Sequence, residues 1–256
     1  MKRIILFLLA TLLLLSVPVS AATNKAARIK ASFFAIPETK KEVTKEELDK
    51  NTFIFETGLK TLTKLTKSST VSFKMWIPGY LFKKAGDDIS ISPYLIAVDT
   101  KTNKAVYWMN SEYNFCIFYN GTNNMILDVW DNFTGKKIDA KKYASMKKKG
   151  SYYILTIKDL PVVRSVYSVS DKKIIPVSKL DLKNKYKLVS QIQTIFTMEY
   201  KGSANIFLDN LTVQTTAKQN ISYNSTTTYG YLEGFNAYDA ATKGKLLPVK
   251  LIAQPF

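Results

Sequence analysis

Histidine is absent from the 256-residue chain, and cysteine occurs once, at Cys116. Without histidine, neither a Ser-His-Asp triad nor a Cys-His pair can form, and the commonest general base of enzymes is missing. One cysteine and no histidine cannot supply the usual shell of a zinc ion, so any metal ion would need oxygen ligands. No disulfide can form within the chain either. The fold must therefore be held by burial of apolar side chains, and the apolar run around Cys116 predicts that this thiol is buried as a small hydrophobe.

Arginine is scarce: beyond the first few residues it occurs only at Arg28 and Arg164, although the formal net charge of the whole chain is +17. Lysines supply the excess and are spread along the chain, with one dense cluster at residues 147–149. The scarcity of arginine argues against bidentate contacts to phosphates or bases, so no nucleic-acid partner is expected. The positive charge has two interpretations. It keeps an exported protein soluble, or it attracts the chain to an anionic surface such as an acidic polysaccharide or lipid headgroups.

The start of the chain carries the one long apolar run in the sequence. A basic beginning at residues 1–3 precedes an almost unbroken apolar run at residues 4–15, and small residues follow up to Ala21. This order is typical of a secretory signal peptide, here residues 1–21. A retained membrane anchor is the alternative, but the run is shorter than the roughly 20 residues that span a bilayer. We therefore predict a secreted or extracytoplasmic protein, in the periplasm or at the cell surface, with no transmembrane segment after cleavage.

Residues 22–50 are predicted to form a polar entry segment rich in lysine and glutamate. The apolar stretch Ala31–Ile36 indicates a first strand before a proline. Thr44 and Glu47 have the spacing of a capping box, in which each side chain accepts a hydrogen bond from the backbone of the other residue. A short helix is therefore expected to begin after Thr44 and to end near Lys50.

Residues 51–215 are predicted to form a single β domain. Short runs rich in Val, Ile, Tyr, Phe and Thr alternate with turn residues, which is the pattern of β-strands. Many such runs and few helices favour an all-β fold, an antiparallel β-sandwich of the jelly-roll kind. Residues 216–256 form a C-terminal tail with an edge strand at Leu246–Ala253, which either covers a sheet edge or reaches a partner. The other predicted strands are Thr52–Glu56, Thr70–Ile77, Ile89–Val98, Ala105–Met109, Phe115–Tyr119, Met125–Trp130, Tyr152–Ile157, Ser165–Val169, Lys187–Tyr200 and Ala204–Val213.

Three segments of this region share a pattern: Phe55-Glu56-Thr57-Gly58, then Val71–Pro78 (VSFKMWIP), then Ile206–Val213 (IFLDNLTV). Together they resemble the galactose-binding-like β-jelly-roll family, which includes many carbohydrate-binding modules of bacterial glycoside hydrolases. In that family an F-E-x-G element opens the sandwich and a strand containing Asp-Asn completes it. Such a module is usually one part of a large enzyme, whereas this chain has no catalytic domain attached.

The resemblance also implies a structural calcium ion (Ca2+), held by acidic residues that match Glu56 and Asp209. Calcium prefers about six to eight oxygen ligands, which carboxylates and backbone carbonyls at strand ends can supply. A calcium ion that links the first and last strands would also compensate for the missing disulfide. The alternative is that Glu56 and Asp209 are ordinary turn or surface carboxylates.

Sugar recognition in such modules relies on aromatic rings that stack on sugar rings, beside polar groups that bind hydroxyls. Trp76 lies in the most apolar strand and is expected in the core. Trp108 and Trp130 have polar neighbours, and either could face the ligand, with Tyr107 or Tyr119 extending the stacking surface. Core packing is the alternative role for each of these rings.

The function predicted from these features is that of a secreted, non-catalytic carbohydrate-binding protein. It would recognise a polysaccharide or a cell-surface glycan, anionic glycans included, through a concave sheet face. The alternative is a structural or adhesive surface protein that assembles or binds a protein partner. No enzyme is predicted, because glycosidases need two carboxylates across a cleft and the acidic clusters at residues 87–88 and 128–131 lie in turn-like contexts.

Overall fold

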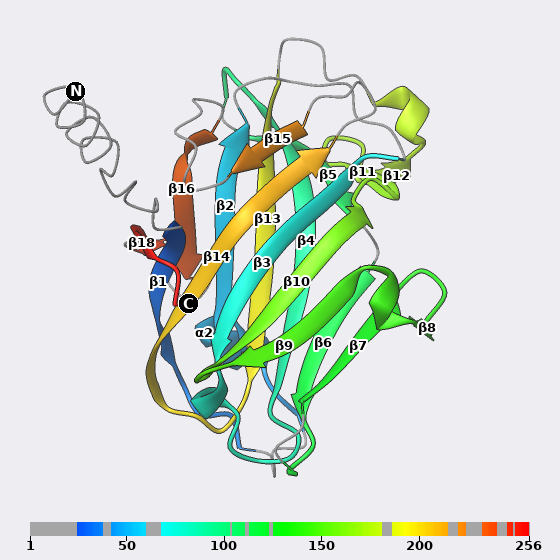
Figure 1. Cartoon of the computed structure of the whole chain (residues 1–256). Helices are drawn as coiled ribbons and strands as arrows, with labels where there is room; N and C mark the ends of the chain where they lie inside the picture. Colours follow the sequence, from blue (N-terminus) through cyan, green and yellow to red (C-terminus); the bar gives the residue numbers. More distant parts are fainter. Residues whose placement is uncertain are drawn as a thin grey trace, which may run out of the picture.

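The chain folds as two antiparallel sheets that pack face to face (Figure 1). The predicted all-β antiparallel sandwich is therefore confirmed. The predicted signal peptide, residues 1–21, lies outside the described residues. Within the described part of the chain, no helix is long and apolar enough to cross a lipid bilayer. The computed structural model describes residues 25–37, 42–59, 68–102, 104–110, 113–122, 125–180, 186–214, 220–223, 232–239, 245–247 and 249–255.

Sheet A is the front sheet in Figure 1 and joins strands from both ends of the chain. Its long strands alternate between apolar residues that face the other sheet and residues that face outward. In order across the sheet, the strands are β18 (Val249–Ala253), β1 (Lys25–Phe33), β14 (Gly202–Gln214), β3 (Thr70–Pro78), β10 (Tyr152–Pro161) and β9 (Ala144–Lys149), with β15 (Asn220–Tyr223) also paired to β14.

Sheet B lies behind sheet A and is the wider of the two. Strands β5 and β6 both pair with β4, at successive positions along it, so the sheet divides into two branches beside β4. The main path runs β12 (Lys173–Ile175), β11 (Ser165–Ser168), β5 (Ala105–Asn110), β4 (Asp88–Asp99), β13 (Tyr186–Thr197), β2 (Thr52–Leu59), β16 (Leu232–Asp239) and β17 (Lys245–Leu247). The second branch is β6 (Tyr113–Tyr119), β7 (Met125–Asp131) and β8 (Lys136–Ile138).

The predicted capping box is present at the start of α2 (Lys45–Lys50), the α-helix of the described residues. The backbone N–H of Thr44 donates to Glu47 Oε2 over 3.0 Å, and the backbone N–H of Glu47 donates to Thr44 Oγ1 over 3.3 Å. These two bonds satisfy backbone donors that a helix start would otherwise leave without partners. The remaining helical pieces are short 3-10 turns at Gly79–Leu81, Ala140–Lys142 and Val177–Lys179.

The first and last strands of the described residues are built into the sheets. The first strand spans Lys25–Phe33 and not the predicted Ala31–Ile36, and it pairs with β14 on one side and β18 on the other. The strand predicted at Leu246–Ala253 is two strands: β17 pairs with β16 in sheet B, and β18 covers the edge of β1 in sheet A. The described part of the tail thus covers sheet edges, which reduces the number of backbone groups open to other chains.

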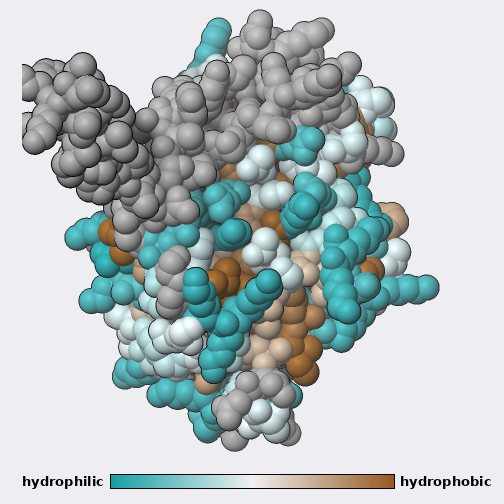
Figure 2. Space-filling model, in the orientation of Figure 1, coloured by the Kyte–Doolittle hydropathy of each residue, from teal (hydrophilic) through white to brown (hydrophobic). Residues whose placement is uncertain are grey.

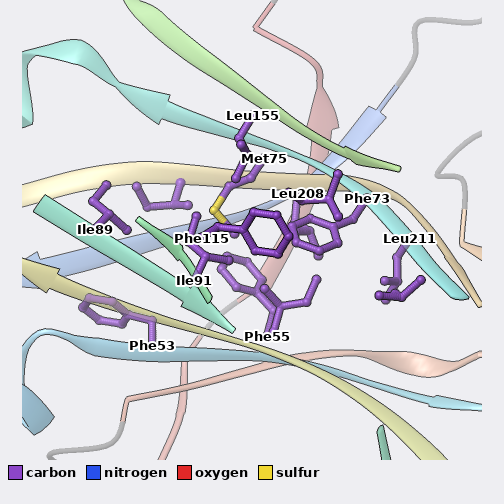
Figure 3. Packing of buried hydrophobic residues seen from close by; sticks show 14 of the residues in the cluster. Phe53, Phe55, Phe73, Met75, Ile89, Ile91, Phe115, Leu155, Leu208 and Leu211 are labelled. Atoms are coloured by element: carbon purple, nitrogen blue, oxygen red, sulfur yellow. The ribbon is translucent and has the colours of Figure 1, made fainter. Parts of the chain in front are cut away.

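The core fills the space between the sheets. Three phenylalanine rings connect the two sheets near one end. The ring centre of Phe33 in sheet A lies 4.9 Å from that of Phe196 and 5.4 Å from that of Phe53, both in sheet B, and the contacts are edge-to-face. Such contacts add to the free energy gained by burying the rings. Figure 3 shows further side chains of the two sheets pointing toward one another, among them Phe73, Met75, Leu155, Leu208 and Leu211 from sheet A and Phe53, Phe55, Ile89, Ile91 and Phe115 from sheet B.

Cys116 differs from the prediction of a buried small hydrophobe, since it is only half-buried. Its neighbours Phe115 and Ile117 take the core positions, so Cys116 points to the outer face of sheet B. It lies between Ser90 of β4 and Asp128 of β7. Partial burial raises the pKa of the thiol, and the nearby carboxylate of Asp88 raises it further. The thiolate is therefore disfavoured at neutral pH.

We predict that Phe33→Ala lowers the free energy of unfolding by about 3–5 kcal/mol, because it removes the ring that joins the two sheets and leaves a cavity. The matched control is its neighbour Phe34, which points outward and is 50% exposed. Phe34→Ala should lower the free energy of unfolding by less than about 1 kcal/mol. Denaturant unfolding followed by tryptophan fluorescence measures both, and equal losses in the two variants would contradict this account of the core.

Candidate functional site

The outer face of sheet B carries two neighbouring rows of side chains that run across the strands. Because residues alternate between the two faces of a strand, the outward positions follow from the core positions on either side of them. On β4, for example, Leu95 and Ala97 face the core, so Tyr94 and Ile96 face outward. The backbone pairings then show which outward residues lie side by side.

The first row is apolar and contains two exposed aromatic rings. Trp108 of β5 pairs with Ile96 on one side and with Tyr167 of β11 on the other. Trp108 and Tyr167 are each 40% exposed. We call this set the aromatic row; in order across the sheet it consists of Ile174, Tyr167, Trp108, Ile96 and Val189.

The second row is polar and lies two residues further along the strands, about 7 Å away. We call it the polar row: Asn110, Tyr94, Gln191 and Glu56. The side-chain amide of Gln191 donates to Glu56 Oε2 over 2.5 Å. The Tyr94 ring meets the edge of Trp108, with 6.4 Å between ring centres and 77° between ring planes, and so connects the two rows. Neither row contains a lysine or an arginine.

The structure separates Trp108 from Tyr107, which the sequence placed in one stacking surface. Since the two are neighbours in β5, they point to opposite faces of the sheet. Tyr107 packs against the core and meets the edge of Tyr186, with ring centres 5.9 Å apart. Adjacent aromatic residues in a strand therefore do not extend one another's surface.

Tyr119 lies away from the aromatic row. It is partly buried against the core and lines a pocket of about 250 Å³ at the end of the sandwich where β4 begins. Tyr80, Phe82 and Tyr153 also line this pocket, and Lys148 places its ammonium group over the Tyr153 ring at 5.7 Å. Tyr119 thus belongs to a different part of the molecule from Trp108.

Trp130 shares the outer face of sheet B with Trp108, and it is 39% exposed. It lies in β7 opposite Asn114 of β6, whose side chain accepts a hydrogen bond from Ser92 of β4 over 2.6 Å. Ser92 and Ile96 are four residues apart on β4, which corresponds to about 13 Å. The two tryptophans therefore occupy one face but do not touch the same small ligand. Trp76, by contrast, is 3% exposed, but it is buried beside Ala26 and Phe207 on the outer face of sheet A and not in the predicted core between the sheets.

Glu56 and Asp209, the predicted calcium ligands, are not brought together. Glu56 faces outward from sheet B, whereas Asp209 lies on sheet A, on the outer side of β14 beside Lys74 of β3. Asp209 Oδ2 accepts a hydrogen bond from the side-chain amide of Gln254 over 2.5 Å. With the core between them, these two carboxylates do not fit one cation. Among the described residues, no group of three acidic or cysteine side chains could hold a metal ion either.

The acidic residues that the sequence placed in turns make structural bonds. Asp87 accepts hydrogen bonds from the backbone N–H groups of Lys83 and Lys84, over 2.6 and 2.9 Å, and from that of Glu199. Asp131 accepts from the turn that follows it and lies 2.9 Å from Arg164. Asp87 and Asp131 thus fix loops, as their sequence context indicated. Asp88 and Asp128, by contrast, lie within strands β4 and β7 and not in turns.

The outward residues of the two rows could have been recognised only in part from the sequence. Trp108 was found because tryptophan is rare, but Tyr94, Tyr167 and Gln191 lie in predicted strands and were missed. Their strands have buried residues on both faces, as the burial of Ile96 and Val189 shows. Alternation alone therefore does not say which face is the outer one.

Comparison with protein families, with characterised proteins and with solved structures gave no match.

We predict that Asp88→Asn stabilises the protein at pH 7 by about 1–3 kcal/mol. Burial raises the pKa of Asp88 from 3.8 to about 6, against a hydrogen bond with Thr197 that lowers it. The fold therefore disfavours the ionised carboxyl group, and the wild type should gain stability as the pH falls from 7 toward 4, because the folded state takes up the proton first. Asparagine carries no ionisable group, so the substitution removes both the free-energy cost of burying an ionised carboxyl group at pH 7 and this pH dependence. Denaturant unfolding at several pH values measures the difference, and an identical pH slope in variant and wild type would contradict the prediction.

Proposed function

We propose that this protein is a secreted, non-catalytic carbohydrate-binding protein, whose ligand stacks on the aromatic row of sheet B. The observation that carries the proposal is the pair of exposed rings on neighbouring strands, Trp108 and Tyr167, beside a row of amide and carboxylate groups. Secretion rests on the signal peptide predicted at residues 1–21.

The chemistry of the two rows suits a sugar. A pyranose ring has apolar C–H faces and a rim of hydroxyl groups. Aromatic rings cover the former. Side-chain amides donate to and accept from the hydroxyl groups, and carboxylates accept from them. Trp108 and Tyr167 provide the stacking surface, and Asn110, two residues along β5 from Trp108, is the group of the polar row that lies nearest to a ring placed on it. Gln191 and Glu56 lie two and three strands away from β5, so they suit the further units of a longer glycan. The aromatic and polar rows together resemble a site built to orient a sugar rather than to anchor a purely apolar ligand.

Binding without catalysis is favoured by the same arrangement. A glycosidase places two carboxylates about 5–10 Å apart on either side of the bond that it breaks. In the two rows Glu56 is the carboxylate, and it is already bonded to Gln191. On the second branch of sheet B, Asp128 is paired with Lys137 over 2.5 Å. The resemblance of three segments to the galactose-binding-like family supports the same proposal.

The experiment is a glycan-array screen of the purified protein, followed by calorimetry with the best neutral oligosaccharide. Trp108→Ala and Tyr167→Ala should each weaken binding by about 10-fold or more, which corresponds to about 1.4 kcal/mol or more. Phe34→Ala is the control, because it removes an exposed ring that belongs to neither row. Trp130→Ala tests whether a longer glycan reaches the second branch of the sheet. Unchanged affinity in both Trp108→Ala and Tyr167→Ala would contradict the proposal.

One observation favours the alternative, a structural or adhesive protein. Ile174 is 68% exposed on β12, which ends the main path of sheet B beside Tyr167. An apolar edge of this kind is suited to contact with another protein chain. If Ile174→Lys lowers the mass of the protein in solution, measured by light scattering, while no glycan binds, the aromatic row is an assembly surface.

A further inference from the structure

Positive charge is concentrated on the outer face of sheet A. The strands of this sheet contain two acidic residues within the described part of the chain, Asp159 and Asp209. Asp209 is 1% exposed and bonded to Gln254. The same strands carry six cationic residues that face outward. We call them the basic face: Arg28 and Lys30 on β1, Lys74 on β3, Lys147 and Lys149 on β9, and Lys250 on β18.

The cations of the basic face surround an apolar centre. Along one register line, Lys147 at the β9 edge is followed by Ile154, Trp76 and Phe207, and then by Arg28 and Lys250 at the other edge. The line crosses six strands and is about 24 Å long. Figure 2 looks onto this side of the molecule and shows hydrophilic side chains around a smaller apolar strip.

The basic face therefore differs in chemistry from the aromatic and polar rows of sheet B, although Lys137 lies elsewhere on the outer face of sheet B, paired with Asp128. The aromatic and polar rows of sheet B contain exposed rings and no cation, whereas the basic face contains cations and buried rings. Trp76 and Phe207 are only 3% and 4% exposed. Arg28 and Lys250 lie side by side on neighbouring strands whose backbones are about 5 Å apart. Their like charges repel one another, and an anionic partner relieves that repulsion.

We propose that the basic face binds an anionic polysaccharide, carboxylated or sulfated, at a second site that does not depend on the proposed sugar site of sheet B. Five of its six cations are lysines, which act as point charges and tolerate varied geometry, as a flexible chain of repeated charges requires. A polymer lying along the register line would meet cations at both ends. Among the residues that the structure describes, no exposed apolar side chain projects from the centre of the face to enter a bilayer, and no exposed ring lies there to stack on bases.

The test compares two variants that lose the same amount of charge. The first carries Arg28→Gln, Lys30→Gln, Lys147→Gln and Lys149→Gln. The control carries Lys101→Gln, Lys104→Gln, Lys173→Gln and Lys179→Gln, all exposed and all outside sheet A. Binding to heparin and to polygalacturonate is measured at several salt concentrations. We expect the affinity of the wild type for both polysaccharides to fall as the salt concentration rises. The affinity of the first variant should be lower than that of the wild type by about 10-fold or more. The affinity of the control should be lower by less than about threefold.

Three results would overturn the proposal. Equal losses in the two variants would mean that binding follows net charge alone. Absence of saturable binding by the wild type would remove the site. Tighter binding to vesicles of phosphatidylcholine and phosphatidylserine than to either polysaccharide, abolished by the first variant, would assign the face to a membrane.

Two further measurements keep the result interpretable. Thermal unfolding of each variant shows whether a loss of binding is a loss of fold. Trp108→Ala should leave heparin binding within about twofold, and the basic-face variant should leave the affinity for a neutral oligosaccharide equally unchanged. Failure of one site is thereby distinguishable from failure of the other.

Discussion

The alternation of side chains along each strand is the constraint on which the rest of this structure depends. With no disulfide available, the two sheets are held together by the residues that point inward, and every such residue forces its neighbours outward. Trp108 is exposed because Tyr107 and Met109 take positions on the core side. In the same way Lys147 and Lys149 face outward while Lys148 points the other way and lies over the Tyr153 ring. The chemistry of both outer faces is thus set by the packing between the sheets.

The grouping of cations on the outer face of sheet A is invisible in the sequence, where lysines are spread along the whole chain. It arises because the strands of one sheet come from distant segments. Arg28, Lys74 and Lys147 belong to β1, β3 and β9, and become neighbours only when β14 and β10 pair between them. A statement about net charge alone therefore could not distinguish a solvated surface from a binding face. The register of the strands is the missing information.

The sequence was sufficient for features that depend on local pattern. The capping box at Thr44 and Glu47 and most strands were predictable, because the donors, acceptors and alternation lie within a few residues. The first strand was misplaced since its inward residues begin with Ala27, and alanine is a weak apolar signal. The calcium pair failed for a different reason. Glu56 and Asp209 match a family pattern, but which sheet each strand joins is decided by pairings more than 100 residues apart.

The position of the two faces has a consequence for binding. Packed sheets are separated by about 10 Å of core, and neither face shares a side chain with the other. A ligand on sheet B therefore does not block one on sheet A, and with a rigid core between them the two binding free energies should be additive. Because the two faces point away from each other, one molecule would bridge two separate glycan chains, one on each side of the sandwich, and would not bind both on a single flat surface. A single small sandwich could in this way join two kinds of glycan without any moving part.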